Sequence, residues 1–233
     1  MKTSLIIPAY NEEKYIGKCL ESVINQTIIP DEIVVCDNNS SDNTAKIIKQ
    51  YAKKYPIKYV FEKQKGIKYT LEKAWRSASG DIILRTDADS IIPCDWVKNM
   101  ISHLESDKEL VACGGTPRAS DGSFIFKAAT LFAIPIQDFI FKISKGYTIL
   151  IGSNFAIRRK TLEKFNGYQP LNSCVSDDNM ISDRLYKNNL KFKRFADCWN
   201  LTSTRRYHKK PFKEAIYGLI SIFKPHFYRE KSS

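Results

Sequence analysis

The sequence predicts an α/β protein whose mostly parallel central sheet is flanked by helices. Short apolar runs alternate with segments of helical periodicity through the first half of the chain, which is typical of successive βα units. Polar residues stand directly after three of these runs, and the carboxyl ends of parallel strands are where such sheets bind ligands. A chain of 233 residues that is 43% hydrophobic can bury one sizeable core. We therefore expect a single domain and a short tail.

Each predicted strand is a short apolar run, and each predicted helix repeats its apolar residues on one face. The predicted strands are Leu5–Ile7, Ile33–Cys36, Tyr59–Phe61, Ile82–Leu84 and Leu110–Cys113. The helices between them are predicted over residues 15–24, 45–52, 71–78 and 96–104. Beyond this point the periodicity loosens, which favours an elaboration of the same core over a second domain.

Membrane insertion and export are not expected. The most hydrophobic stretch, Phe124–Phe141, is interrupted by Lys127, Pro135 and Asp138. It falls short of the roughly 20 apolar residues of a membrane-spanning helix. It is predicted as a membrane-surface or core helix. The first apolar run is too short for a signal peptide, and the six cysteines are scattered singly, so we expect reduced thiols in a cytoplasmic protein.

The net charge of +12 is concentrated toward the end of the chain. Residues 202–233 hold eight Lys or Arg and two Glu, a surplus of +6, which suggests an anionic partner: diphosphate, acidic lipid or nucleic acid. A helical stripe within this tail comprises Phe212, Ile216, Leu219, Ile220 and Phe223. The stripe predicts a basic amphipathic helix that contacts an anionic membrane, packs on the domain or forms a homodimer.

An acidic pair after the fourth strand predicts a divalent metal. In an extended segment Asp87 and Asp89 would point to one side and Ala88 away from it. Two carboxylates facing a diphosphate would repel it unless Mg²⁺ or Mn²⁺ lay between them. An Asp-x-Asp sequence also forms turns and helix caps, but its position after a buried strand favours the metal site.

A second polar strand end bears Asp37, whose buried carboxylate would be costly without a partner. It could accept the imide proton of a pyrimidine base, or it could close an Asx turn, while Asp42 could cap the next helix. The chain has no Gly-x-Gly-x-x-Gly segment and no Gly-Lys phosphate loop. The absence of these motifs argues against a dinucleotide dehydrogenase or a P-loop nucleotide hydrolase.

These motifs, taken in order, closely resemble those of the family 2 inverting glycosyltransferases, which have the GT-A fold. The resemblance covers about Thr3 to Arg206. Its motifs are Ile6–Glu13, Ile33–Asp37, Gly80–Asp81 leading into Asp87–Asp89, Gly152–Arg159 and Asp177–Leu185. It implies a GT-A domain over residues 1–201, with a nucleotide-sugar-binding half (1–115) and an acceptor half (116–201), followed by the tail (202–233).

The resemblance also implies roles for individual residues. Pro8, Tyr10 and Glu12 would surround the nucleoside, with Asp37 on the base. Asp89 would be the main metal ligand, while Asp87 would face ribose or metal. Further contacts to the nucleotide sugar are expected from Ala9, Asn39, Gly66, Lys68, Arg85, Ala88 and Arg206. Asn38 stands where the family often has a second Asp.

The pair Asp177 and Asp178 takes the place of the family's Glu-Asp motif, whose second acid is the general base. Asp178 is therefore the predicted base, and Asp177 is placed with it in the catalytic site. An acceptor hydroxyl must lose its proton as it attacks, and a positioned carboxylate can take it. Apolar residues follow at helical spacing, so both acids are predicted in the first turn of a helix, where they would also stabilise the helix dipole.

The predicted reaction is inverting, metal-dependent transfer of a sugar from a nucleoside diphosphate donor, with a UDP-sugar favoured, to a hydroxyl of a glycan or lipid-linked acceptor. The basic run Arg205–Lys210 departs from the Gln-x-x-Arg-Trp motif of processive synthases, which favours single addition. A sugar-nucleotide nucleotidyltransferase and an inactive nucleotide-sugar-binding relative are the alternatives. Acidic strand ends argue against a nucleic-acid-binding protein. The tail could bring the enzyme to the inner face of the cell membrane.

Overall fold

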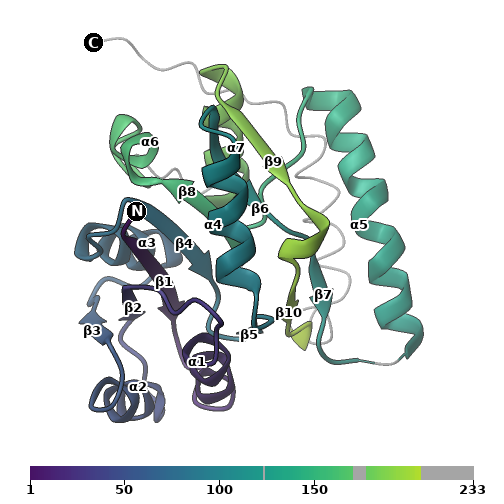
Figure 1. Cartoon of the computed structure of the whole chain (residues 1–233). Helices are drawn as coiled ribbons and strands as arrows, with labels where there is room; N and C mark the ends of the chain where they lie inside the picture. Colours follow the sequence, from purple (N-terminus) through teal and green to yellow (C-terminus); the bar gives the residue numbers. More distant parts are fainter. Residues whose placement is uncertain (123, 170–176, 206–233) are drawn as a thin grey trace.

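A seven-stranded sheet forms the centre of the molecule (Figure 1). The computed structural model describes residues 1–122, 124–169 and 177–205, with the side chains of 124–134 and 177–179 outside that description. The strand order is β3-β2-β1-β4-β8-β6-β9. The strands are β1 (Thr3–Ala9), β2 (Glu32–Asp37), β3 (Ile57–Phe61), β4 (Ile82–Thr86), β6 (Leu110–Gly114), β8 (Asn154–Arg158) and β9 (Lys191–Arg194). Among these strands β8 alone is antiparallel to its neighbours, which confirms a mostly parallel sheet.

Helices cover both faces of this sheet, so the molecule has three layers. The alternation of side chains along a strand sends Leu5 and Ile7 to one face and Ile6 to the other. The first face packs against α1 (Ile16–Ile24), α2 (Thr44–Ala52) and α4 (Trp96–Ser106). The second packs against α3 (Ile67–Ser77), α6 (Arg159–Lys164) and α7 (Asp177–Lys187). The predicted α/β class is therefore confirmed.

A smaller sheet of three short strands adjoins the ends of β1 and β4. Its order is β5 (Ser90–Ile91), β10 (Asn200–Thr202) and β7 (Pro117–Ala119). The hydroxyl groups of Ser90 and Thr202 lie 2.9 Å apart, and the Ser120 amide donates to the Thr202 carbonyl at 3.0 Å. After β10, which follows η1 (Ala196–Cys198), the chain is therefore held beside the segment that follows β4.

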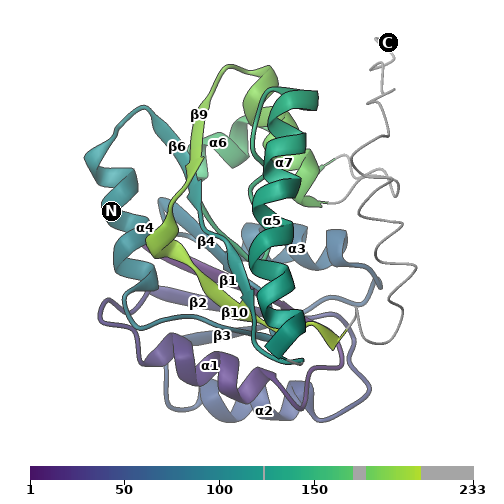
Figure 2. The ribbon, with the colours of Figure 1, turned by 90° about the vertical axis from the view of Figure 1, so that its right-hand side faces the viewer.

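The long helix α5 (Phe124–Lys145) stands at the outside of the second half (Figure 2). Asp138 pairs with Arg194 of β9, and Phe141 is buried, whereas Phe139 and Ile143 are 65% and 71% exposed. The predicted helix is thus present, with one face packed and another facing solvent. In the described ranges, no helix combines the length and the hydropathy that crossing a bilayer requires.

Candidate functional site

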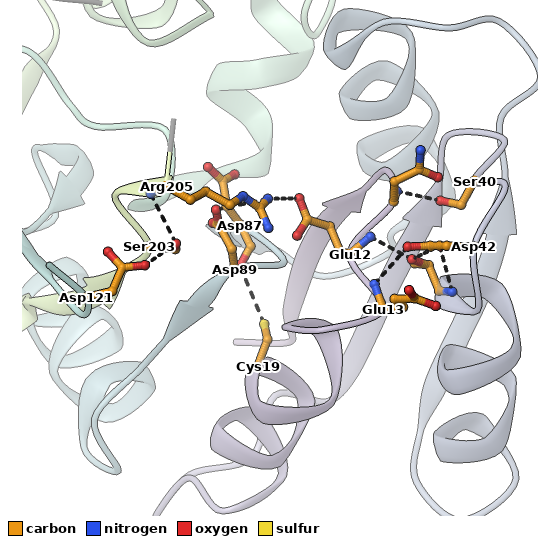
Figure 3. A network of polar contacts seen from close by, with 12 residues as sticks. Glu12, Glu13, Cys19, Ser40, Asp42, Asp87, Asp89, Asp121, Ser203 and Arg205 are labelled. Carbon is orange, nitrogen blue, oxygen red and sulfur yellow. Dashed lines mark hydrogen bonds and ion pairs between the residues drawn. The ribbon is translucent and has the colours of Figure 1, made fainter. Parts of the chain in front are cut away.

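Asp87 and Asp89 lie in a tight turn between β4 and β5. The Ser90 amide donates to the Asp87 carbonyl at 3.0 Å, so the extended conformation predicted for this segment is wrong. The turn leads into β5, which pairs antiparallel with β10. Ala88 is 3% exposed and packs in the core, while both acids lie beside Glu12 and Arg205 (Figure 3). We call Glu12, Asp87 and Asp89 the acidic cluster.

Arg205 is the basic partner of the acidic cluster. Its Nη2 atom contacts Glu12 Oε1 and lies 3.3 Å from Asp89 Oδ2. The side chains of Glu12 and Asp89 are only 9% and 8% exposed. Burial alone would lower the pKa of Arg205, but its hydrogen bond and ion pairs with these acids outweigh burial and raise it. The sequence placed Arg205 in a basic run, but it did not indicate which acids it contacts.

Asp121 holds the chain around Arg205 in place. Its Oδ2 atom accepts a hydrogen bond from the Ser203 hydroxyl at 2.5 Å. Its Oδ1 atom accepts from the Thr204 amide at 2.7 Å and from the Thr204 hydroxyl. The ring of Tyr15 lies 4.4 Å from the Arg205 guanidinium carbon. Residues 202–205, assigned to the tail on sequence grounds, thus contribute to this site.

The oxygen atoms of the acidic cluster fit a hard divalent cation. Glu12 Oε1 and Asp89 Oδ2 converge on one nitrogen of Arg205, so a single positive centre can contact both. Glu12 Oε2 is buried and has no hydrogen-bond partner among the described residues. Mg²⁺ and Mn²⁺ prefer carboxylate oxygen ligands of this kind.

The buried thiol of Cys19 lies next to the acidic cluster, and the negative charge of the cluster affects its pKa. The thiol is 1% exposed and lies 3.5 Å from the Asp87 carbonyl. Burial raises its pKa well above the ordinary range, and the carboxylates of Asp89, Asp87 and Glu12 raise it further. The described cysteines are free thiols, and Cys174 lies outside the described residues.

The loop after β2 is built around two acids. Asp37 accepts hydrogen bonds from the Ser40 amide at 3.2 Å and from the Tyr59 hydroxyl at 3.1 Å, which is the Asx-turn alternative. Burial, followed by the nearby Asp37 carboxylate, raises the pKa of Tyr59 to about 12. Asp42 accepts hydrogen bonds from the Thr44 amide and hydroxyl and from the Glu13 amide. The N-cap residue of α2 is Asn43, so the cap lies one position after the predicted Asp42, which binds the first residue of the helix. A contact between Asp37 and a base stays a prediction.

Asn38 connects this loop to the segment before α3. Its amide nitrogen donates to the carbonyls of Glu62 and Gln64 at 3.2 and 2.7 Å, and its oxygen accepts from the Gly66 amide at 2.7 Å. A carboxylate could not make both donated bonds. Asn38 thus has a structural role that sequence reasoning missed, and it positions Gly66, which begins the segment that carries Lys68.

The other predicted nucleotide contacts occupy the same sheet edge with different exposure. Pro8 and Ala9 are buried in β1, and Arg85 lies under the turn with Nη2 3.6 Å from Asp87 Oδ1. Tyr10 is 45% exposed, and the Lys65 ammonium donates to its hydroxyl at 3.3 Å. Asn39 is exposed, with a φ of 58°.

The predicted catalytic acids begin α7, as expected, since this helix starts at Asp177. The side chains of Asp177 and Asp178 lie outside the described residues, and so does Arg206 with the rest of the tail. Their roles remain predictions. On the same helix, Asp183 pairs with Lys187 at 2.8 Å.

A second group of potential metal ligands consists of His103, Asp197 and Cys198, with ligand atoms within 4.8 Å of one another. His103 Nε2 lies 3.0 Å from both carboxylate oxygens of Asp197, and its ring stacks on Phe195 at 3.6 Å. Packing and one hydrogen-bonded pair therefore account for this group without a metal.

The site thus combines an acidic cluster with a polar loop at the carboxyl ends of β1, β2 and β4. Residues 4–165 match the family model described as "Glycosyl transferase family 2". The chain belongs to this family. Membership sets aside the nucleotidyltransferase alternative. "Probable glycosyltransferase YdaM" of Bacillus subtilis is 32% identical over 198 residues, which cover 79% of this chain and 46% of that protein.

Solved structures of other glycosyltransferases share the fold. The mannosyltransferase PcManGT from Pyrobaculum calidifontis, in complex with GDP-Man and Mn²⁺, superposes with a TM-score of 0.74 at 25% identity, covering 95% of this chain and 63% of that one. Glucosyl-3-phosphoglycerate synthase from Mycobacterium tuberculosis gives a TM-score of 0.67 at 18% identity, covering 97% of this chain and 80% of that one. The fold is therefore GT-A. The chain spans less than half the length of the first curated relatives it matches.

Proposed function

We propose that this protein transfers a sugar from a nucleoside diphosphate donor to an acceptor hydroxyl, with inversion at the anomeric carbon and with Mg²⁺ or Mn²⁺ bound. The observation that carries the proposal is the convergence of Glu12 and Asp89 oxygens on a single cationic nitrogen at the strand ends. Family membership supports the reaction class. The complex of PcManGT with GDP-Man and Mn²⁺ supports the donor class and the metal.

In this proposal the acidic cluster binds the diphosphate of the donor through the metal, and the loop after β2 binds the base. Asp89 and Asp87 would hold the metal, with Glu12 beside them, and the ion would neutralise charge on the departing nucleoside diphosphate. Asp37, already oriented by Ser40 and Tyr59, faces the base and favours uridine. The exposed ring of Tyr10 offers a surface beside the nucleoside.

Asp178 is the proposed general base. It takes the proton from the acceptor hydroxyl as that oxygen attacks the anomeric carbon from the face opposite the diphosphate. Its place in the first turn of α7 fixes the backbone from which the carboxylate projects. Asp177 beside it positions the acceptor, and one sugar is added in each encounter.

The acceptor is proposed to be lipid-linked and presented at the cytoplasmic face of a membrane. Ile136, Phe139 and Ile143 lie on one face of α5 and are 59%, 65% and 71% exposed, with the exposed Lys142 beside them. Apolar faces flanked by lysine bind anionic lipid surfaces, and the basic tail would add attraction.

Flotation with anionic vesicles should recover the protein, and the double variant Phe139→Ser, Ile143→Ser should reduce recovery. Equal recovery would argue against this part of the proposal.

The test of the base compares two acids on one helix. Asp178→Asn should leave binding of the donor unchanged in calorimetry and reduce sugar transfer or donor hydrolysis by about 10²- to 10⁴-fold. Asp183→Asn, which removes a carboxylate paired with Lys187, should lose much less activity. Normal turnover by Asp178→Asn would remove the base assignment.

The test of the donor site uses thermal stability. A bound ligand stabilises the folded state by mass action, by about 2.7 kcal/mol at a concentration 100 times its Kd. UDP with Mn²⁺ should raise the melting temperature more than GDP with Mn²⁺, and Asp89→Ala should abolish the rise. A larger rise with GDP would reverse the uridine preference. Binding of donor without any hydrolysis or transfer would identify an inactive relative.

A further inference from the structure

The guanidinium group of Arg205 lies where the proposed function requires the divalent cation. Its Nη2 atom contacts Glu12 Oε1 and is 3.3 Å from Asp89 Oδ2 (Figure 3). These are the oxygens that fit a metal ion. Two positive centres so close together in a poorly hydrated site would repel each other strongly. Arg205 in this position and a metal on Asp89 therefore exclude each other.

Hydrogen bonds to the residues just before Arg205 fix its position, so its ion pairs are not a loose contact between two surface side chains. Its own side chain is 21% exposed. Asp121 binds Ser203 and Thr204, and the Ser203 amide donates to the Asp89 carbonyl at 3.3 Å. The backbone that leads to Arg205 is thus bound directly to the turn that carries Asp89. The guanidinium can leave the acids by side-chain rotation while this support stays intact.

The buried acids explain why a cation is needed before the donor arrives. A carboxylate taken out of water without a counter-charge is strongly disfavoured, and the side chains of Glu12 and Asp89 are both more than nine-tenths buried. Arg205 supplies that charge. A metal ion that enters with the donor supplies more positive charge at the same oxygens, while the diphosphate brings negative charge that attracts the displaced guanidinium.

We propose that Arg205 is an exchangeable internal cation, which occupies the metal position of the donor-free protein and must leave it before Mg²⁺ or Mn²⁺ can bind. This inference rests on the proposed function and adds the order of events in which the metal and the nucleotide bind. The metal alone binds weakly because it must displace Arg205. The metal and the nucleotide bind cooperatively because the diphosphate draws the displaced side chain away from the acids.

The experiment measures Mn²⁺ affinity by calorimetry or by the electron paramagnetic resonance of free Mn²⁺, without nucleotide and with saturating UDP or GDP. Arg205→Gln should bind Mn²⁺ alone about tenfold more tightly than the wild type, within the range of usual coupling energies. It should also show less tightening by nucleotide. Arg76→Gln removes the same charge from an ion pair with Glu72 on α3, where the Arg76 side chain is 53% exposed, and should leave the affinity unchanged.

Arg205→Lys provides a second variant that keeps the charge. Its ammonium cannot stack on the Tyr15 ring as the planar guanidinium does, so it should hold the acids less firmly and its Mn²⁺ affinity should lie between those of the wild type and Arg205→Gln. Unchanged or weaker Mn²⁺ binding in whichever of these variants folds, as judged by thermal unfolding, would overturn the exchange. If the wild type binds Mn²⁺ with nucleotide but Arg205→Gln shows no gain, the exchange fails and the proposed function stands. If Mn²⁺ binds to no variant even with nucleotide, both fail.

Discussion

Replacing Asn38 by Asp tests the structural role found for this residue. The change keeps the shape and the bond from the Gly66 amide, but it removes both bonds donated to the carbonyls of Glu62 and Gln64. Each lost bond costs about 1 kcal/mol, and a carboxylate facing two carbonyl oxygens adds a comparable penalty. Because Asn38 is only 4% exposed, solvent compensates little. We expect Asn38→Asp to lose about 3 kcal/mol of unfolding free energy.

The penalty should depend on pH in a defined direction. Burial and the facing carbonyls would raise the folded pKa of the new carboxyl above the value of about 3.9 in the unfolded chain. The part of the penalty that comes from the charge is then absent below the unfolded pKa and grows as the pH rises toward the folded pKa. Urea unfolding followed by circular dichroism should therefore show a larger loss at about pH 7.5 than at about pH 5.

Asn39→Asp is the matched control for this experiment. Asn39 is the next residue, is exposed and has a φ of 58°, a conformation that Asp adopts nearly as readily as Asn. It should change the unfolding free energy by less than about 0.5 kcal/mol. Equal stabilities of Asn38→Asp and Asn39→Asp at neutral pH would refute the structural role of the Asn38 amide.

Three further predictions follow from burial and hydrogen bonding. Cys94, which is exposed, should react with a thiol reagent in the native protein, whereas Cys19, whose pKa is raised by burial and nearby acids, should stay unmodified; equal rates would contradict this. For Asp42, burial raises the pKa but hydrogen bonds outweigh it and lower the pKa. The stability lost in Asp42→Asn should thus be largest at neutral pH and shrink as the pH falls below about 4. Asp121→Ala should cost about 2 kcal/mol in urea unfolding by releasing residues 203–205; unchanged stability would argue against that support.

The strands of the first half were predictable because their sequences carry one clear signal. Residues such as Leu5, Ile6 and Ile7 are apolar without interruption, and in a sheet covered on both faces every one of them is buried. The helices between the strands repeat apolar residues on a single face. Sequence and structure therefore agree on β1 to β4 and on the helices that follow them.

The site was predictable in its residues but less so in its contacts. Asp89 and Glu12 were expected near a ligand, but the turn at Asp87 leads into β5, whose partner β10 lies more than 100 residues away in the sequence. The pair of Glu12 and Arg205 spans 193 positions, and no local pattern reports such a contact. Asn38 differs from the family's usual Asp, and only the carbonyls around it show why an amide is suited to that position.

The small sheet has a consequence for how the chain folds during synthesis. Strands β1, β2 and β4 can pair once residue 86 has emerged from the ribosome, because their partners lie within that stretch. The pairing of β10 with β5 and β7 must wait for residues 200–202. During this interval Glu12 and Asp89 have not yet met Arg205, so these two carboxylates lack the counter-charge that it supplies in the folded protein. Completion of the site thus follows the pairing of β1, β2 and β4.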